Sequence, residues 1–248
     1  MAPPLIGILG GMGPLAAVDL MQKMIEETSA ASDQEQIAAV CWNVPQIPDR
    51  QHALAGTGAS PLPAMIEGIV ALNRIGATRI VIACNTAHHW FDALCAASTA
   101  PLLHIVDATL AALPSTHESA PSHRIATVGL LATQGTLDAG LYQPSLAARG
   151  ITCIIPSDEE MLTLFTPGCY AIKQGRMANG AALLDQLAQR LVDRGAQRLL
   201  MACTEVPPAL AYGASVHLPI CIDPTRALAR ACAAYWHETR PQRKPLSK

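Results

Sequence analysis

The chain repeats itself at an offset of 119 residues. IGATRIVIAC, from Ile75 to Cys84, lies over RGAQRLLMAC, from Arg194 to Cys203, and IGILG from Ile6 lies over IATVG from Ile125. IVDATLAAL from Ile105 also resembles CIDPTRALA from Cys221 after a small gap, which predicts in each copy an apolar strand ending in Asp before a helix. Several stretches that match in order at one offset indicate a duplicated structural unit. We therefore expect two similar lobes, joined through the Pro- and Ser-rich segment 114–123.

Each copy alternates short runs of Ile, Val and Leu with longer helical patterns, such as GPLAAVDLMQKMIEET and ALLDQLAQRLVDRG. This alternation is typical of βαβ units, in which helices cover a parallel sheet. The predicted fold class is α/β, with two pseudo-symmetric lobes that each contain a mainly parallel sheet flanked by helices. Ligands of such sheets bind outside the carboxyl ends of the strands, so we expect the active site in the cleft between the lobes.

Composition excludes several classes of function. The formal net charge is −2 and aromatic residues make up 4% of the chain, so neither a polyanion-binding field nor base-stacking surfaces are indicated, and no nucleic-acid partner is expected. The N-terminal stretch lacks a basic leader pattern and no segment approaches the length of a membrane span, which predicts a cytoplasmic protein without a membrane partner. The eight cysteines include no CxxC pair, so we expect reduced thiols and no metal site.

Cys84 and Cys203 differ from the other cysteines in their context. Each follows a predicted strand at the same position of the repeat, and each precedes hydrogen-bonding residues, Asn85-Thr86 and Thr204-Glu205. A thiol at a helix N-terminus has a lowered pKa and becomes a usable base or nucleophile. The ordinary role of cysteine is that of a small buried hydrophobe. We assign that role to the remaining six: Cys41, Cys95, Cys153, Cys169, Cys221 and Cys232.

Two equivalent thiols suit a reaction with two equivalent faces. Acyl transfer needs one cysteine with a histidine base, whereas inversion of a carbon stereocentre needs a base on one side and an acid on the other. The carbanion beside a carboxylate must be stabilised by fixed donors. Suitable donors are Asn85, Thr86, Thr204 and the backbone N–H groups at the two helix starts, while Glu205 is placed to orient a neighbouring group or a substrate ammonium.

Five motifs together resemble the aspartate/glutamate racemase family, and within it the aspartate racemase branch. They are GILGGMGPLAA (7–17), IPDR (47–50), CNTAH (84–88), GLLATQGTL (129–137) and ACTEVP (202–207), and the resemblance extends from about residue 5 to 235. It implies a cofactor-independent racemase of an acidic amino acid, with Cys84 and Cys203 as the two bases. It also implies that the last strand and helix return to the first lobe. The lobes would then be 1–104 plus 214–240 and 105–213, followed by a tail, 241–248.

The resemblance further assigns substrate contacts. Arg50 and Lys173 would hold the side-chain carboxylate of the substrate. Five residues would surround its α-carboxylate: Met12, Asn85, Thr86, Thr127 and Thr204. The chain departs from the family pattern at Ala202, where family members usually carry Gly, and its match around YAIKQG is looser. His88 is expected to be a capping or core residue and not a catalytic one.

Other functions compete with this interpretation. GMGPLA (11–16) fits a dinucleotide-binding pattern, but the next predicted strand ends at Asn43 and Pro45, without the acid that binds the ribose. No lysine has the context of a pyridoxal phosphate site, so no cofactor is expected. The same scaffold hosts hydantoin racemases, maleate isomerases and arylmalonate decarboxylases. A non-catalytic alternative is a ligand-binding or redox-sensing protein in which Cys84 and Cys203 pair as a disulfide. A symmetric homodimer is the default assembly.

Overall fold

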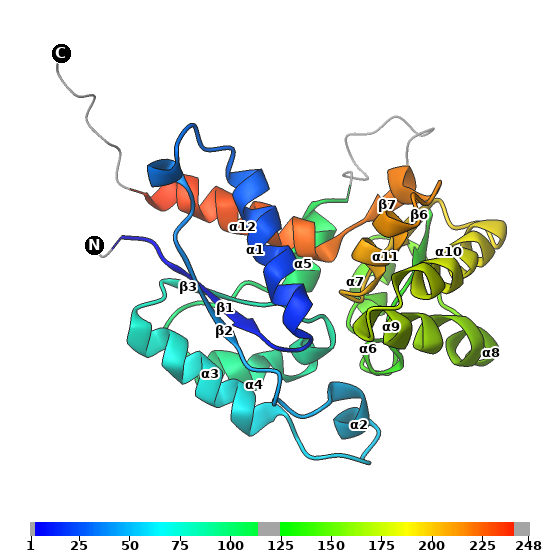
Figure 1. Ribbon diagram of the computed structural model, residues 1–248, viewed down its shortest axis with the longest axis horizontal. Coiled ribbons are helices and arrows are strands. Elements are labelled where there is room, and N and C mark those ends of the chain that lie inside the picture. The colour runs from blue at the N-terminus through cyan, green and yellow to red at the C-terminus, as the bar shows by residue number, and fades with distance from the viewer. Residues whose placement is uncertain (1–2, 114–124, 241–248) are drawn as a thin grey trace.

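The computed structural model describes residues 3–113 and 125–240 of the chain (Figure 1). The predicted connection 114–123 and the tail 241–248 lie outside the described residues. The rest forms an α/β structure of two parallel sheets flanked by helices, which confirms the predicted fold class. No helix within the described ranges is both long and apolar enough to cross a bilayer.

The first sheet has the strand order β2-β1-β3 and all of its pairs are parallel. Its strands are β1 (Ile6–Gly10), β2 (Ala39–Asn43) and β3 (Arg79–Ile82). The side chains of Ile6 and Ile8 join a core cluster with helix α1 (Pro14–Thr28), whereas Leu9 belongs to a cluster with helix α3 (Leu62–Ile75). Both faces of the sheet are therefore covered at its central strand β1, which is buried and apolar throughout, as expected for a parallel sheet. Four shorter helical segments complete this half: η1 (Asp33–Glu35), α2 (Arg50–Leu54), η2 (Thr86–Trp90) and α4 (Phe91–Ala96).

The second sheet has the order β5-β4-β6-β7, again parallel. Its strands are β4 (Thr127–Leu130), β5 (Thr152–Ile154), β6 (Arg198–Leu200) and β7 (Cys221–Ile222). Its helical segments are α6 (Gln134–Asp138), α7 (Gln143–Ala147), α8 (Asp158–Glu160), the π-helical turn η4 (Met161–Phe165), α9 (Thr166–Lys173), α10 (Met177–Asp193), α11 (Val206–Tyr212) and η5 (Leu218–Ile220). Segments 158–173 run on without interruption, so the π turn sits inside one helical stretch that carries Cys169 and Lys173.

Strand pairing supports the duplication and corrects one of its details. Leu199 pairs with Cys221 in the second sheet, and Ile80 forms the corresponding isolated bridge with Leu102 in the first, each 119 residues earlier. β7 therefore belongs to the second sheet, and its predicted return to the first lobe is wrong. The reason is local, because β7 lies directly beside β6 and completes the same edge that Leu102 completes in the first lobe.

The first strands of the two copies correspond at an offset of 122, not 119. A Cβ on Gly7 would lie 2.9 Å from the Cβ of Ala77, and a Cβ on Gly129 would lie 3.0 Å from the Cβ of Ala196. Both glycines let a helix approach the central strand closely. Ala77 and Ala196 are 119 residues apart, but Gly7 and Gly129 are 122 apart. The predicted pairing of IGILG with IATVG is thus displaced by three residues, and GILGGMG corresponds to GLLATQG.

The last helices of the two copies pack against each other. The helices are α5 (Ile105–Ala111) and α12 (Pro224–Thr239), and each begins after a side-chain N-cap, His104 or Asp223 respectively. The predicted equivalence of Asp107 with Asp223 is wrong, because Asp107 lies in the first turn of α5. α12 packs along α1 and against α5 (Figure 1). Ion pairs from Arg226 and Arg230 to Glu26 and Glu27 fix α12 to α1 at 2.8–2.9 Å.

Candidate active site

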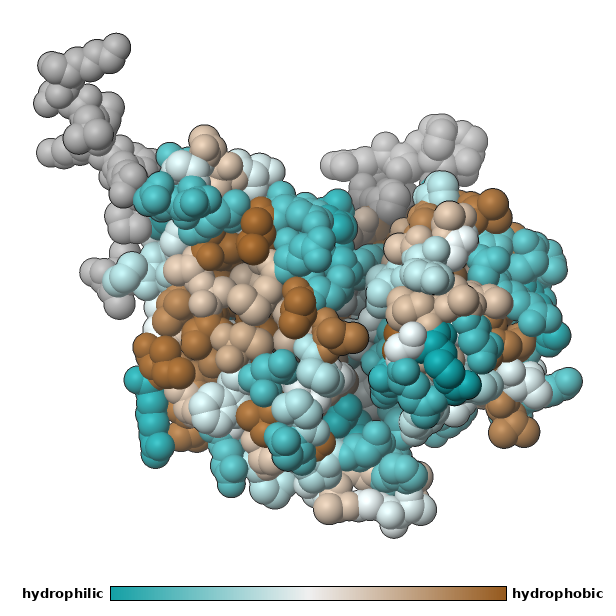
Figure 2. Space-filling model, in the orientation of Figure 1, coloured by the Kyte–Doolittle hydropathy of each residue, from teal (hydrophilic) through white to brown (hydrophobic). Residues whose placement is uncertain are grey.

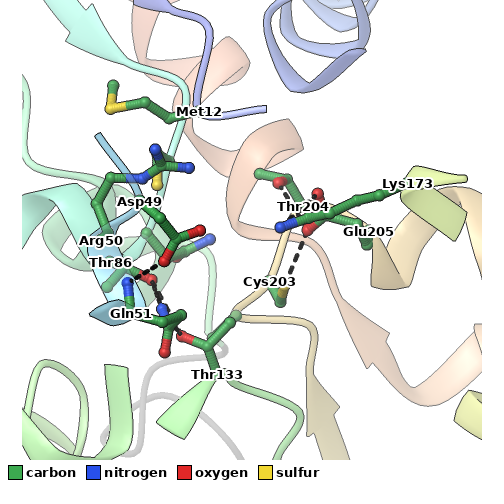
Figure 3. Close-up of a pocket in the computed structure, with 13 residues that line it drawn as sticks. Met12, Asp49, Arg50, Gln51, Thr86, Thr133, Lys173, Cys203, Thr204 and Glu205 are labelled. Carbon is green, nitrogen blue, oxygen red and sulfur yellow. Dashed lines mark hydrogen bonds and ion pairs between the residues drawn. The ribbon is translucent and has the colours of Figure 1, made fainter. Parts of the chain in front are cut away.

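A pocket lies between the lobes, beyond the carboxyl ends of the strands (Figure 3). Both Cys84 and Cys203 line it. We call it the inter-lobe pocket. Its remaining lining residues are Met12, Asp49, Arg50, Gln51, Asn85, Thr86, Thr133, Lys173, Ala202, Thr204 and Glu205. The structure therefore brings together every residue expected from the sequence except Thr127. The volume of the pocket is about 40 Å³.

Thr127 is the one incorrect site prediction. It is the first residue of β4, at the end of the strand opposite to the pocket, and its N–H donates to Oε1 of Gln197. The structure places Thr133 in the pocket instead. Thr133 lies in GLLATQG, which corresponds at the offset of 122 to the GILGGMG stretch that carries Met12, so this offset was the signal that could have pointed to the loop after β4.

Cys84 follows β3 and is 6% exposed. Its carbonyl oxygen lies 2.8 Å from Nδ1 of His88, and the N–H of Ile105 donates to Nε2 of the same ring across 3.2 Å. Because Nε2 accepts a hydrogen bond, Nδ1 carries the proton and donates to Cys84. Burial and the neighbouring His104 lower the pKa of His88 to about 3, so the ring is neutral. His88 thus ties the strand end that carries Cys84 to the start of α5, which agrees with its expected structural role.

Cys203 follows β6 and is also 6% exposed, but its thiol has two close partners. It donates to Oε2 of Glu205 across 3.0 Å, and its Sγ lies 3.9 Å from Sγ of Cys169. The hydrogen bond with Cys169, burial and the Glu205 carboxylate raise the pKa of Cys203 well above its ordinary value. The expected lowering by a helix N-terminus is therefore wrong for this thiol. α11 is only seven residues long and begins three residues after Cys203, so its dipole is outweighed by the buried neighbours.

Asn85 presents one unpartnered donor at the pocket. Tyr142, which is fully buried, donates its hydroxyl proton to Oδ1 of Asn85 across 2.5 Å. Nδ2 of Asn85 is buried and has no hydrogen-bond partner within the described residues. An amide nitrogen left in this way costs free energy unless a ligand accepts from it. Because Asn85 lines the inter-lobe pocket, its amide is a candidate donor to an anionic group bound there.

Arg50 is held in place by its own loop. Asp49 caps α2 by accepting from the N–H groups of Gln51 and His52, while Nη1 of Arg50 donates to the carbonyl oxygens of Ile47 and Pro48 at 3.2 and 2.9 Å. Nε of Arg50 is buried and makes no hydrogen bond to any described residue. A guanidinium fixed on one edge keeps its other donors available for a carboxylate.

Lys173 approaches from the opposite side of the pocket, at the end of α9 (Figure 3). Its Nζ lies 3.9 Å from Oε1 of Glu205. Burial lowers the pKa of Lys173, but the Glu205 carboxylate and the nearby thiols raise it by more, so the net pKa lies above its ordinary value. Lys173 is therefore a cation, and the pocket holds two positive groups, Arg50 and Lys173, across from one another.

A hydrogen-bonded cluster joins the lobes at the lower side of the pocket in Figure 3. Nε2 of Gln51 donates to Oγ1 of Thr133 across 3.0 Å and to Oγ1 of Thr86 across 3.3 Å, while Oε1 of Gln51 accepts from the N–H of Gly135 across 2.8 Å. The hydroxyls of Thr86, Thr133 and Thr136 lie 2.9–3.0 Å from one another. Gln51 was not expected from the sequence, and Asp49 appeared there only within the IPDR motif, without an assigned role.

The donor set of the pocket is thiol, carboxylate, hydroxyl, amide, guanidinium and ammonium. In residues 3–113 and 125–240, no group of three or more His, Cys, Asp or Glu side chains is arranged to hold a metal ion. What the arrangement offers is two sulfur atoms for proton transfer, cations for carboxylates, and directed N–H and O–H donors.

Comparison with known proteins gives consistent matches. The profile of the Asp/Glu/hydantoin racemase family matches residues 9–232. The broad specificity amino-acid racemase RacX of Bacillus subtilis (strain 168) is 26% identical over 231 residues, which cover 92% of this chain and 96% of the relative. The aspartate racemase of Picrophilus torridus superposes with a TM-score of 0.81 at 29% identity, covering 94% of each chain. The glutamate racemase of Francisella tularensis subsp. tularensis SCHU S4 shares the fold, with a TM-score of 0.71 at 15% identity over 98% of this chain and 84% of that one.

Proposed function

Because the chain belongs to the Asp/Glu/hydantoin racemase family, we propose that it is an amino-acid racemase that uses Cys84 and Cys203 as its two bases and needs no cofactor. Family membership supports amino-acid racemisation in general. The observation that carries the two-cysteine mechanism is that both thiols line one small pocket, each from a different lobe.

The proposed reaction moves one proton off the α-carbon and another onto it. A thiolate on one side takes the α-proton and becomes a thiol, while the thiol on the opposite side gives its proton to the carbanion and becomes a thiolate. The resting assignment follows from the surroundings of Cys203, because Cys169, burial and Glu205 keep its proton in place. Cys203 is then the acid for one enantiomer, with Cys84 as the base, and the opposite enantiomer uses the pair in reverse.

The carbanion develops charge on the α-carboxylate, so that group needs fixed donors. Nδ2 of Asn85 is the first candidate, because it has no partner among the described residues and Tyr142 holds the other end of the amide. The hydroxyls of Thr86 and Thr204 lie in the same lining. The Asn85 amide costs little reorganisation when the charge forms, because Tyr142 fixes it before the substrate arrives.

We further propose that the substrates include acidic amino acids. Arg50 and Lys173 place two cations in a pocket of about 40 Å³, which suits a molecule with two carboxylates. Asp49 and Glu205 in the same lining balance these charges and supply acceptors for a substrate ammonium. The aspartate racemase similar to this chain supports the same class of substrate.

The test is to incubate the purified protein with L-aspartate, D-aspartate, L-glutamate or D-glutamate without added cofactor and to follow the enantiomers by chiral chromatography. The proposal expects both enantiomers to approach a 1:1 mixture, at rates unchanged by hydroxylamine, which traps the carbonyl of pyridoxal phosphate. Loss of activity with hydroxylamine, or no conversion of any amino acid, would contradict it.

A further inference from the structure

A second cavity adjoins the inter-lobe pocket and is much larger, with a volume of about 400 Å³. It is lined by Gly13, Pro14, Leu15, Ala16, Val18, Asp19, Gln22, Ile172, Lys173, Met177, Thr204, Glu205 and Pro208. Three of these residues, Lys173, Thr204 and Glu205, also line the inter-lobe pocket. The two cavities therefore meet at these side chains.

The inter-lobe pocket, at about 40 Å³, has about a tenth of the volume of the second cavity. A short acidic side chain can end at the cations of the inter-lobe pocket. A longer side chain on an α-carbon between the two thiols would extend past Lys173 and Glu205. The adjoining cavity is the larger of the two spaces, and it begins where Lys173 and Glu205 end the pocket.

The second cavity has the lining of a site for an apolar group. Leu15, Val18 and Pro14 come from the start of α1, and Ile172 and Met177 come from the facing lobe. Leu15 is 71% and Val18 is 56% exposed, which is unusual for large apolar side chains on a packed helix. Figure 2 shows an apolar surface over this end of α1, beside the hollow that separates the lobes. Concave sites with mostly apolar walls and a few polar groups are typical of small-molecule subsites.

Charge in the second cavity disfavours an acidic occupant. Its ionisable side chains are two carboxylates, Asp19 and Glu205, and one ammonium, Lys173. Asp19 is already paired with Lys23 at 2.6 Å. An added carboxylate would therefore meet more negative than positive groups in the lining, whereas a neutral side chain would meet no charge repulsion. The walls and the charges together select an apolar group.

Lys173 is suited to stand at the boundary of the two cavities. Its side chain is 40% exposed and its Nζ is 3.9 Å from Glu205, so the ammonium is not tightly fixed. A lysine can keep its ammonium near water or a carboxylate while its methylene stem lines an apolar path. With an acidic substrate, the Lys173 ammonium would contact the substrate's side-chain carboxylate. With an apolar substrate, the methylene stem of Lys173 would contact the substrate's side chain.

We propose that the second cavity is the side-chain subsite for amino acids with apolar side chains of about four carbon or sulfur atoms, such as methionine and leucine. This inference rests on the proposed racemase function and extends its substrates beyond acidic amino acids. The side chain lies against Leu15, Val18 and Met177, while the α-carbon stays between Cys84 and Cys203.

The test compares the kcat/KM for α-proton exchange of L-methionine and L-aspartate in D₂O, measured by proton NMR. Wild type is expected to exchange both. Leu15→Gln keeps an exposed helical position but replaces an apolar wall, so it should lower kcat/KM for methionine about tenfold and leave aspartate within about twofold. Ile25→Gln is the matched control, because Ile25 is 54% exposed on the same helix and lies outside the second cavity. It should change neither substrate.

Three outcomes separate the claims. Exchange of aspartate but not of methionine or leucine by wild type overturns the subsite and leaves the racemase proposal standing. Equal loss on both substrates in Leu15→Gln, or the same methionine loss in Ile25→Gln, also overturns the subsite. Absence of exchange with every amino acid overturns the proposed function, and the subsite with it.

Discussion

The thiol of Cys203 donates a hydrogen bond to Oε2 of Glu205 across 3.0 Å, in a position where both side chains are buried. Sγ of Cys169 completes this arrangement at 3.9 Å. Cys169 and Glu205 together keep Cys203 protonated, whereas the hydrogen bond described for Cys84 is accepted by its carbonyl oxygen from His88. The two thiols are equivalent in the repeat but not in their surroundings, which gives the proposed mechanism a defined starting state.

Glu205→Gln should change the pH dependence of both directions. The carboxylate raises the pKa of Cys203, so its removal lowers that pKa. In the direction that uses Cys203 as the base, the rate should rise at a lower pH than in wild type. In the direction that uses Cys203 as the acid, the rate should begin to fall at a lower pH than in wild type. Initial rates of each enantiomer across pH 6–10 measure both limbs.

Cys169→Ala is the companion variant for this prediction. It removes the neighbour with the largest effect on Cys203 without changing the charge of the pocket, and it should move the limbs in the same direction. Profiles that stay in place in both variants would show that Cys203 does not titrate in the reaction.

Tyr142→Phe should weaken substrate binding with little change of structure. The substitution removes the hydroxyl that orients Asn85 and leaves Oδ1 of that amide unsatisfied. The loss of one such bond costs about 1–3 kcal/mol, or roughly tenfold or more in the relevant equilibrium. We expect KM for aspartate to rise by about tenfold. Substrate saturation curves, combined with a melting curve to verify folding, measure this, and an unchanged KM would remove the positioning role of Tyr142.

Gln51→Ala should loosen the closure of the inter-lobe pocket. The side chain makes three hydrogen bonds from α2 to the second lobe and to Thr86, each worth about 0.5–1.5 kcal/mol. We expect a higher KM and faster proteolysis of the α2 segment. His52→Ala is the control, because His52 is the next residue of α2 but is exposed and outside the pocket. Equal effects of the two substitutions would indicate a general loss of helix α2.

The sequence predicted the architecture because duplication leaves a strong pattern in it. RIVIAC and RLLMAC gave the two strands and both thiols, and the βαβ alternation gave the parallel sheets. The predicted alignment of β1 with β4 between the two copies is displaced by three residues, because short apolar runs such as IGILG match equally well at either offset. The close helix approaches at Gly7 and Gly129 decide the alignment, and these contacts join residues far apart in the chain.

The missed site residues share a physical reason. Thr127 was expected from the resemblance, but a side chain at the start of a strand cannot reach a site at the strand's other end. Gln51 and Tyr142 act through contacts with residues 35 to 84 positions away, which no local motif encodes. The raised pKa of Cys203 depends in the same way on Cys169, which comes from α9 and reads in the sequence as an ordinary core cysteine.

His88 should make stability fall as the pH is lowered. Its pKa is about 3 in the folded protein and about 6.5 when unfolded, so the neutral ring stabilises the fold above pH 6.5 and this contribution is lost between pH 6.5 and about 3. In this range the free energy of unfolding should fall by up to about 1.4 kcal/mol per pH unit from this group alone. Urea unfolding at pH 7, 5.5 and 4.5 measures the slope.

His88→Gln should be less stable at pH 7, because it disturbs the bonds to Cys84 and Ile105, but should show a shallower slope below pH 6.5. His89→Gln is the matched control, since His89 is exposed and should leave the slope unchanged. A slope that is the same in wild type and in His88→Gln would mean that His88 is already protonated in the folded state.

The most direct measurement of the two-base mechanism is α-hydrogen exchange of L- and D-aspartate in D₂O by Cys84→Ala and Cys203→Ala, followed by proton NMR and chiral chromatography. The account predicts that neither variant racemises, and that each still exchanges the α-hydrogen of one enantiomer, with opposite preferences in the two variants. Racemisation at the wild-type rate by either variant, or exchange of the same enantiomer by both, would contradict it.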